Sequence, residues 1–148
     1  MRKKIYKSSQ INEMVDKINE NLGFSNSELP SYGSGDDKRP SYVTANKDSY
    51  SLFEYNPYHD KKNQHLIIKT SDINELLFKI FEEATRTMAS NYELENRVAN
   101  QDSRIVLFKK HIEILYSLPL KKEFIDKLRD YYDYLLQLKE PEPIPEKW

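Results

Sequence analysis

Cysteine is missing from this chain of 148 residues. Its absence excludes disulfide bonds and every zinc or iron-sulfur site that depends on thiolate ligands, and it suits a reducing compartment. Long apolar runs are missing as well: none approaches the roughly 18 residues of a membrane span, and the basic segment 1–9 is not followed by the apolar core of a secretory signal. We therefore expect a cytoplasmic protein without a membrane-spanning segment.

The chain also contains few glycines, and neither positive nor negative residues are in large excess. The three glycines do not form a phosphate-binding loop, and there is no Gly-x-Ser-x-Gly elbow. The chain has 23 Lys and Arg residues against 24 Asp and Glu residues, a formal net charge of −1. It therefore lacks the basic field that nucleic acids select, and nucleic acid is not the expected partner.

The three histidines give no sign of a metal site. His59, His65 and His111 are expected in a turn, at the start of a strand and on a helix, without the short spacing that metal ligands usually show. The carboxylate pairs Glu82-Glu83 and Asp130-Asp133 are more typical of solvated helix faces than of acid-base catalysis. We expect no catalytic residue, no bound metal and no cofactor.

Aromatic residues, in contrast, are plentiful: eleven Tyr, six Phe and one Trp. A tyrosine ring packs in apolar surroundings while its hydroxyl reaches water or a hydrogen-bond partner, which suits core edges and protein interfaces alike. A chain of this length buries roughly 70% of the surface that it exposes when unfolded. We predict a single domain over residues 1–148, and its oligomeric state stays open.

The segment 1–23 predicts a helix. Ser8 or Ser9 is the expected N-cap, and Gly23 stands where a left-handed residue is wanted after the last turn. The inner face is expected to carry apolar residues at helical spacing, namely Ile11, Met14, Val15, Ile18 and Leu22.

A loop and a small sheet are expected next. Residues 24–40 are rich in turn formers and predict a loop. Within 41–70, β-branched and aromatic runs predict a hairpin over 42–55 and a third strand over 65–70. The result is an antiparallel meander of about three strands, which is stable only when helices cover one face.

Residues 71–139 predict three packed helices, so the fold class is α+β. Ser71 is the expected N-cap of the first of these helices, with Asp72 in its first turn. The apolar pattern breaks after Val98 and resumes at Ile105, which predicts a bend or a second helix capped by Asp102 or Ser103.

The last helix follows Pro119. Its inner side is expected to consist of Phe124, Leu128, Tyr131, Tyr132, Leu135 and Leu138. The alternating prolines of 140–148 predict an extended, proline-rich tail.

Four charged residues around the bend can form one ionic network. Glu93 and Arg97 are one helical turn apart, and Asp102 and Arg104 follow across the break. We expect this network to be half buried and to fix the bend between the two helices. The expected role is structural.

The stretch 32–60 mixes acidic residues with tyrosines, and two interpretations stay open. A solvated hairpin explains the composition, and so does a surface for a basic protein, on which acids steer the encounter and exposed rings supply contact area. The candidate contact residues are Tyr32, Asp36, Asp37, Tyr50, Tyr55 and Tyr58.

The segments 76–83, 88–97, 101–104 and 107–108 resemble family sixty-three of the bacterial polymorphic-toxin immunity proteins. The resemblance extends loosely over 40–118, with Ile105 in place of a second basic residue and His111 in place of a glutamine. The residues that carry it are Met88, Tyr92, Glu93, Arg97, Asp102, Arg104 and Phe108.

The resemblance implies a non-enzymatic immunity protein that binds a cognate protein toxin in the cytoplasm of the producing cell and blocks its activity. Because partner surfaces should differ between cognate pairs, the family residues are expected to maintain the fold, and the toxin contacts are expected on the loop and hairpin. Two other interpretations stay open: an adaptor domain with a different partner, and a small hydrolase or nucleotide-processing enzyme.

Overall fold

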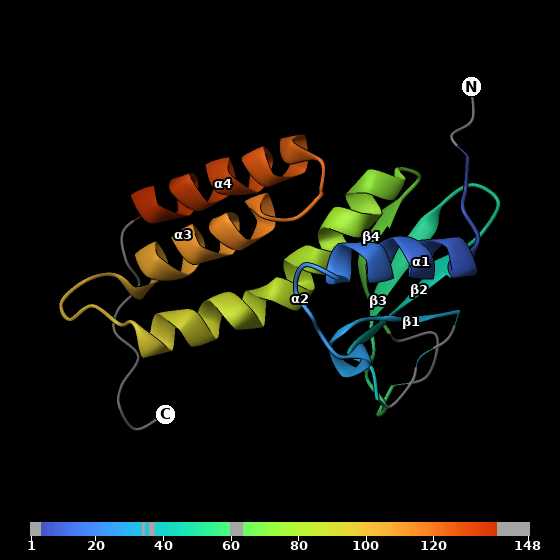
Figure 1. Cartoon of the computed structure of the whole chain (residues 1–148), viewed down its shortest axis with the longest axis horizontal. Coiled ribbons are helices and arrows are strands. Elements are labelled where there is room, and N and C mark those ends of the chain that lie inside the picture. Colours follow the sequence, from blue (N-terminus) through green and yellow to red (C-terminus); the bar gives the residue numbers. More distant parts are fainter. Residues whose placement is uncertain (1–3, 34, 36–37, 60–63, 139–148) are drawn as a thin grey trace.

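The structure is a computed structural model that describes residues 4–33, 35, 38–59 and 64–138. This part of the chain is α+β, as the sequence predicts, and the predicted tail 140–148 lies outside it. None of its helices is long and apolar enough to cross a bilayer. In chain order (Figure 1), the elements are α1 (Ser8–Asn19), the 3-10 helix η1 (Asn26–Glu28), β1 (Ser31–Tyr32), β2 (Ser41–Ala45), β3 (Tyr50–Glu54), β4 (His65–Thr70), α2 (Ile73–Glu95), α3 (Ser103–Tyr116) and α4 (Lys122–Gln137).

Helix α1 forms as predicted, but its N-cap is Lys7 and not Ser8 or Ser9. The Gln10 side chain takes over the capping role, because its Oε1 accepts a hydrogen bond of 2.9 Å from the Lys7 amide. The other end matches the prediction: Gly23 has a φ of +72°. The buried face consists of Ile11, Val15 and Ile18.

The predicted loop 24–40 is wrong in part, because it contains η1 and β1. β1 pairs in parallel with β2, with Ser31 opposite Tyr42 and Tyr32 opposite Val43. Two residues are too few to show the alternation by which a strand is recognised in a sequence. The sheet is therefore mixed and has one strand more than predicted.

The antiparallel meander β2-β3-β4 is confirmed, and the strand order of the sheet is β1-β2-β3-β4. Val43 faces Leu52 across one ladder, and Leu52 faces Ile68 across the next. Val43 and Leu52 belong to the main hydrophobic core, together with buried residues of α1 and α2. One face of the sheet thus packs on helices.

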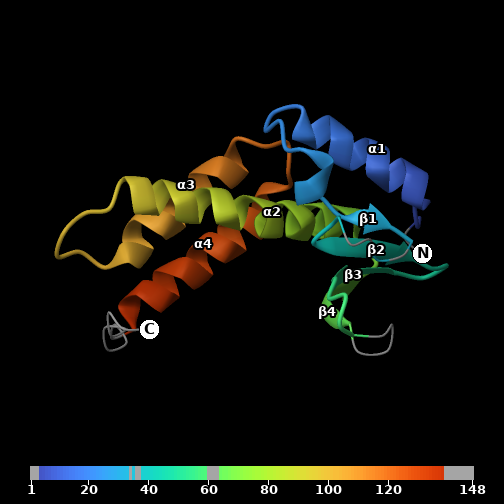
Figure 2. The same cartoon turned by 90° about the horizontal axis from the view of Figure 1, so that it is seen from below.

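Helix α2 connects the two ends of an elongated molecule. Its first turns follow the sheet, and its later turns pack with α3 and α4 at the end opposite α1 and the sheet, as Figure 2 shows. Its N-cap is Asp72 and not Ser71: Asp72 Oδ1 accepts a hydrogen bond of 2.9 Å from the Asn74 amide.

Helices α3 and α4 form an antiparallel pair beside the second half of α2 (Figure 1). Asp102 caps α3, one of the two caps that the sequence predicts, and its Oδ1 accepts from the Arg104 amide at 3.0 Å. On α4 the buried residues are Phe124, Ile125 and Tyr132. The expected inward positions of Tyr131 and Leu138 are wrong: Tyr131 lies on the exposed side of α4, and Leu138 is exposed because it follows the last residue of the helix.

Candidate functional site

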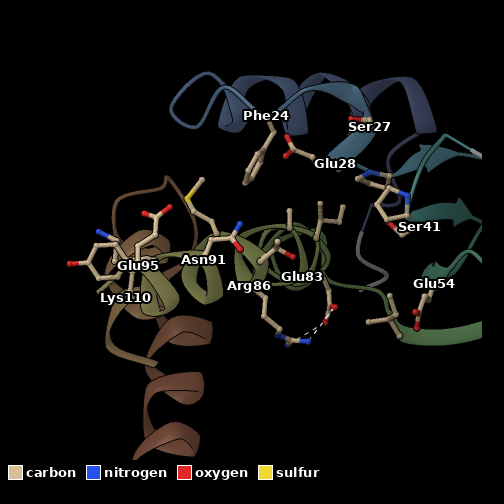
Figure 3. Close-up of a pocket in the computed structure, with 18 residues that line it drawn as sticks. Phe24, Ser27, Glu28, Ser41, Glu54, Glu83, Arg86, Asn91, Glu95 and Lys110 are labelled. Carbon is tan, nitrogen blue, oxygen red and sulfur yellow. Dashed lines mark hydrogen bonds and ion pairs between the residues drawn. The ribbon is translucent and has the colours of Figure 1, made fainter. Parts of the chain in front are cut away.

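A groove of about 840 Å³ runs along α2. One wall is the segment that follows α1, from Phe24 to Pro30, and the other is the face of α2 from Ile80 to Glu95. Figure 3 shows Ser41 and Glu54 at the sheet end of the groove and Glu95 with Lys110 at the other end. Six separate parts of the chain therefore meet in this groove: the segment after α1, the start of β2, the end of β3, β4, α2 and α3.

Apolar side chains form much of the groove's lining. They come from the segment after α1, from β4 and from α2, and they are Phe24, Ile67, Ile80, Ala84, Met88 and Tyr92. Of these, Ile80 is buried, while Tyr92 is exposed. A partially exposed apolar strip rimmed by polar groups is typical of a surface that binds another molecule.

The rim of the groove carries more acidic than basic side chains. Its carboxylates belong to Glu28, Glu54, Glu83 and Glu95, and its cations to Arg86 and Lys110. Both cations make contacts with other side chains of the protein. Arg86 Nη2 lies 3.4 Å from Glu83 Oε1, and Lys110 Nζ lies 3.2 Å from Glu113 Oε1 and 4.4 Å from the centre of the Tyr92 ring.

Three of these carboxylates have no basic partner within the part of the chain that the structure describes. They are Glu28, Glu54 and Glu95, and all three are exposed. Glu28 accepts one hydrogen bond, of 3.1 Å from the Ser25 amide. The groove therefore presents three carboxylates to solvent without an ion-pair partner, while Arg39 lies close by and donates from Nη1 to the Pro30 carbonyl oxygen at 3.0 Å.

The structure places one candidate contact residue, Tyr50, in the interior and leaves a second, Tyr32, half buried. Tyr50 has 0% exposure, so its expected exposure is wrong: Leu52 and Tyr50 share the inward face of β3, and the Tyr50 hydroxyl accepts a hydrogen bond of 2.7 Å from the Tyr6 amide. The Tyr32 hydroxyl is buried without a hydrogen-bond partner in the described residues, and burial raises the pKa of Tyr32.

Two further candidates, Tyr55 and Tyr58, lie at the sheet end of the molecule. Tyr58 is 93% exposed. Tyr55 is half buried: its ring lies directly over Gly35, where a Cβ has no room, and meets the Tyr42 ring edge-on at 6.3 Å. Asp36 and Asp37 lie outside the described residues.

The family residues around the bend form two ion pairs instead of the predicted joint network. Arg97 Nε and Nη2 each lie 3.0 Å from an oxygen of Glu93, one turn earlier on α2. Arg104 Nη2 lies 2.7 Å from Asp102 Oδ2, and Arg104 Nη1 donates to the Leu135 carbonyl oxygen at 3.2 Å. Arg104 thus ties the start of α3 to α4.

Two more of these residues, Met88 and Phe108, are half buried. The Phe108 ring stacks on Tyr132 of α4, with ring centres 3.9 Å apart and planes inclined by 2°. Met88 and Tyr92 line the groove, so these two family residues also reach the surface. Sequence reasoning missed that position, because it considered them only as neighbours of the bend.

His111 is fully buried between α2 and α4. Its ring nitrogens lie within hydrogen-bond distance of Tyr132, Thr85 and the Glu82 carbonyl oxygen.

Within the described part of the chain, no cluster of His, Asp and Glu residues could hold a metal ion. The arrangement around the groove offers shape, apolar surface and negative charge for binding.

A family model described as Immunity protein 63 matches residues 58–133. The match covers just over half of the chain, from the end of the hairpin region through β4, α2 and α3 into α4. This chain belongs to the Immunity protein 63 family. The match begins later and ends later than the resemblance expected over 40–118. No curated protein and no solved structure matches the chain.

Within this Immunity protein 63 domain, the match separates two parts of the groove. The α2 wall lies inside the matched range, while Phe24, Glu28 and Glu54 lie outside it. One part of the groove lining thus comes from residues that the family model matches, and the other part comes from residues 24–54, which the model does not match.

Proposed function

We propose that this protein neutralises a cognate bacterial toxin by binding it in the cytoplasm of the cell that produces both. The observation that supports the proposal is the family match over 58–133, because an immunity protein is one member of a toxin and immunity pair. Immunity proteins are generally non-enzymatic, and inhibition needs only a fitted patch of roughly 800 Å² on each partner. No chemistry by the inhibitor is required.

The toxin contacts in this proposal come from the sheet end of the molecule. Tyr58 offers a freely accessible ring and Tyr55 a partly accessible one. Asp36 and Asp37, which lie outside the described residues, stay candidates for their negative charge alone. Aromatic anchors carry much of the binding energy at protein interfaces, and rim charges steer the encounter. Support comes from the range of the match, because most of the hairpin and the loop lie outside it.

Co-expression with the toxin domain encoded beside this gene tests the proposal. Cells that carry the toxin domain and this protein are expected to grow, whereas cells with the toxin domain and an empty vector stop growing. An unrelated immunity protein from the same expression vector serves as the control for plasmid burden. If the toxin kills cells equally with and without this protein, the proposed function is wrong.

A further inference from the structure

We propose that the groove along α2 receives a basic, extended segment of the toxin. The inference rests on the proposed function and adds the surface and the chemistry of its partner. Cationic side chains of this segment bind Glu28, Glu54 and Glu95, and an apolar side chain packs on the apolar strip of the groove. The groove begins at the end of β3, where Glu54 lines it, and Tyr55 follows Glu54 in the sequence.

Charge favours a basic occupant. The three carboxylates lie on the groove lining without a basic partner in the described part of the chain, and the two cations of the groove are held by other acids. A like-charged segment would meet repulsion there, whereas Lys or Arg side chains would complete ion pairs. The chain's own residues 139–148 contain three glutamates against two lysines, so their composition does not suit this groove.

Length also limits the occupant. From Ile80 to Glu95 the α2 wall extends over about 22 Å, because a helix rises 1.5 Å per residue. An extended chain covers that distance with about seven residues. Glu54 lies at the sheet end of the groove and Glu95 at the other end, and Glu28 lies between them on the wall that faces α2 (Figure 3). The matching segment therefore carries basic side chains toward its ends and a further one near its centre, beside an apolar side chain that packs on the apolar strip.

A charge-reversal experiment tests the groove. The full chain with Glu28→Lys and Glu54→Lys is compared with the wild type for affinity toward the purified toxin domain encoded beside this gene, by isothermal titration calorimetry. We expect an affinity loss of about 100-fold at low salt, since each reversal replaces an attraction by a repulsion. The loss should shrink in 1 M NaCl, where the Debye length falls to about 3 Å.

The matched control carries the same change of charge on exposed helix faces outside the groove, Glu13→Lys with Asp133→Lys. Its affinity is expected to stay within about twofold of the wild type, as is usual for charges outside an interface. Circular dichroism melts of both variants show whether the fold is retained. If the control loses affinity and the groove variant does not, the toxin binds elsewhere and the groove inference is wrong.

A second variant tests the same groove by placing a larger side chain in it. Thr87→Trp places a large ring on the exposed side of α2 within the groove, and Asn12→Trp places the same ring on the exposed face of α1. We expect at least a tenfold loss for Thr87→Trp and none for Asn12→Trp. Wild-type affinity in both groove variants overturns the inference and leaves the proposed function standing, whereas a wild-type protein that does not bind the toxin domain overturns both.

Discussion

His111 connects three helices through hydrogen bonds in the interior. Its Nε2 lies 3.0 Å from Thr85 Oγ and 3.1 Å from the Glu82 carbonyl oxygen, and its Nδ1 lies 2.6 Å from the Tyr132 hydroxyl. Thr85 donates its own hydrogen to the Phe81 carbonyl oxygen, so its Oγ accepts and Nε2 donates. A neutral imidazole with its hydrogen on Nε2 satisfies every one of these partners.

Acidification is therefore expected to destabilise the protein through His111. Burial lowers the pKa of His111 from 6.5 to about 4. Between these values the unfolded chain takes up a proton that the folded chain does not, so each pH unit below 6.5 costs about 1.4 kcal/mol of stability. At pH 5 the loss from this group is about 2 kcal/mol, and above pH 6.5 it vanishes. Urea unfolding at pH 7 and pH 5 measures it.

The control is His111→Gln, because glutamine keeps a donor and an acceptor but does not titrate. Carboxylates that ionise in this range contribute to both proteins, so the difference between their pH slopes isolates the histidine. Equal losses of unfolding free energy in the two proteins would contradict a histidine that stays neutral in the fold.

The bend between α2 and α3 depends on how α2 ends. Glu93, in the last turn, is buried, with 4% of its side chain exposed, whereas 58% of the Arg97 side chain is exposed. A carboxylate that has lost most of its water needs a counter-charge, and Arg97 supplies it from the solvent side. The ion pair lets a polar residue occupy the inner face of α2 beside Ala89.

Replacing Arg97 by alanine is expected to lower the melting temperature by several degrees, because it leaves the buried Glu93 carboxylate without its partner. Adding Glu93→Gln to Arg97→Ala should recover part of the loss, since the double variant buries no charge at this place. Thermal melts followed by circular dichroism measure both. A melting temperature of Arg97→Ala equal to that of the wild type would show that solvent alone compensates Glu93.

Local patterns in the sequence were sufficient to predict most of the elements. Helical spacing predicts α1, α2, α3 and α4, and the β-branched runs predict β2, β3 and β4. The details that failed depend on contacts outside the local pattern. Gln10 caps α1 from inside the helix, β1 exists only because β2 lies beside it, and Tyr131 is exposed because α4 packs on a single side.

At the scale of the whole molecule, the sheet with α1 and the helical pair α3-α4 lie at opposite ends of α2 (Figure 2). The groove lies along the helix that connects them, and its lining comes from residues as distant in sequence as Phe24 and Lys110. No spacing rule joins such positions, so the sequence could not predict the groove. The family, in contrast, was predictable, because the residues that carry it cluster within 76–108.

The proposed mechanism is inhibition by occupancy. A protein that binds over a toxin needs a complementary surface, and this molecule offers an acidic, partly apolar groove whose lining includes the exposed Tyr92. Each molecule of such an inhibitor blocks one toxin molecule at a time, so the inhibited fraction follows the molar ratio of the two proteins. An enzyme that inactivated the toxin would instead turn over and would be effective at substoichiometric amounts.

Titration of the purified toxin domain with this protein tests that claim most directly. Toxin activity on its own substrate is measured at a toxin concentration well above the expected dissociation constant, while the amount of the protein is increased. We predict that activity falls linearly and reaches zero at a fixed, small-integer molar ratio, with both proteins recovered chemically intact. Loss of toxin activity at strongly substoichiometric amounts, or no loss at any ratio, would contradict the account.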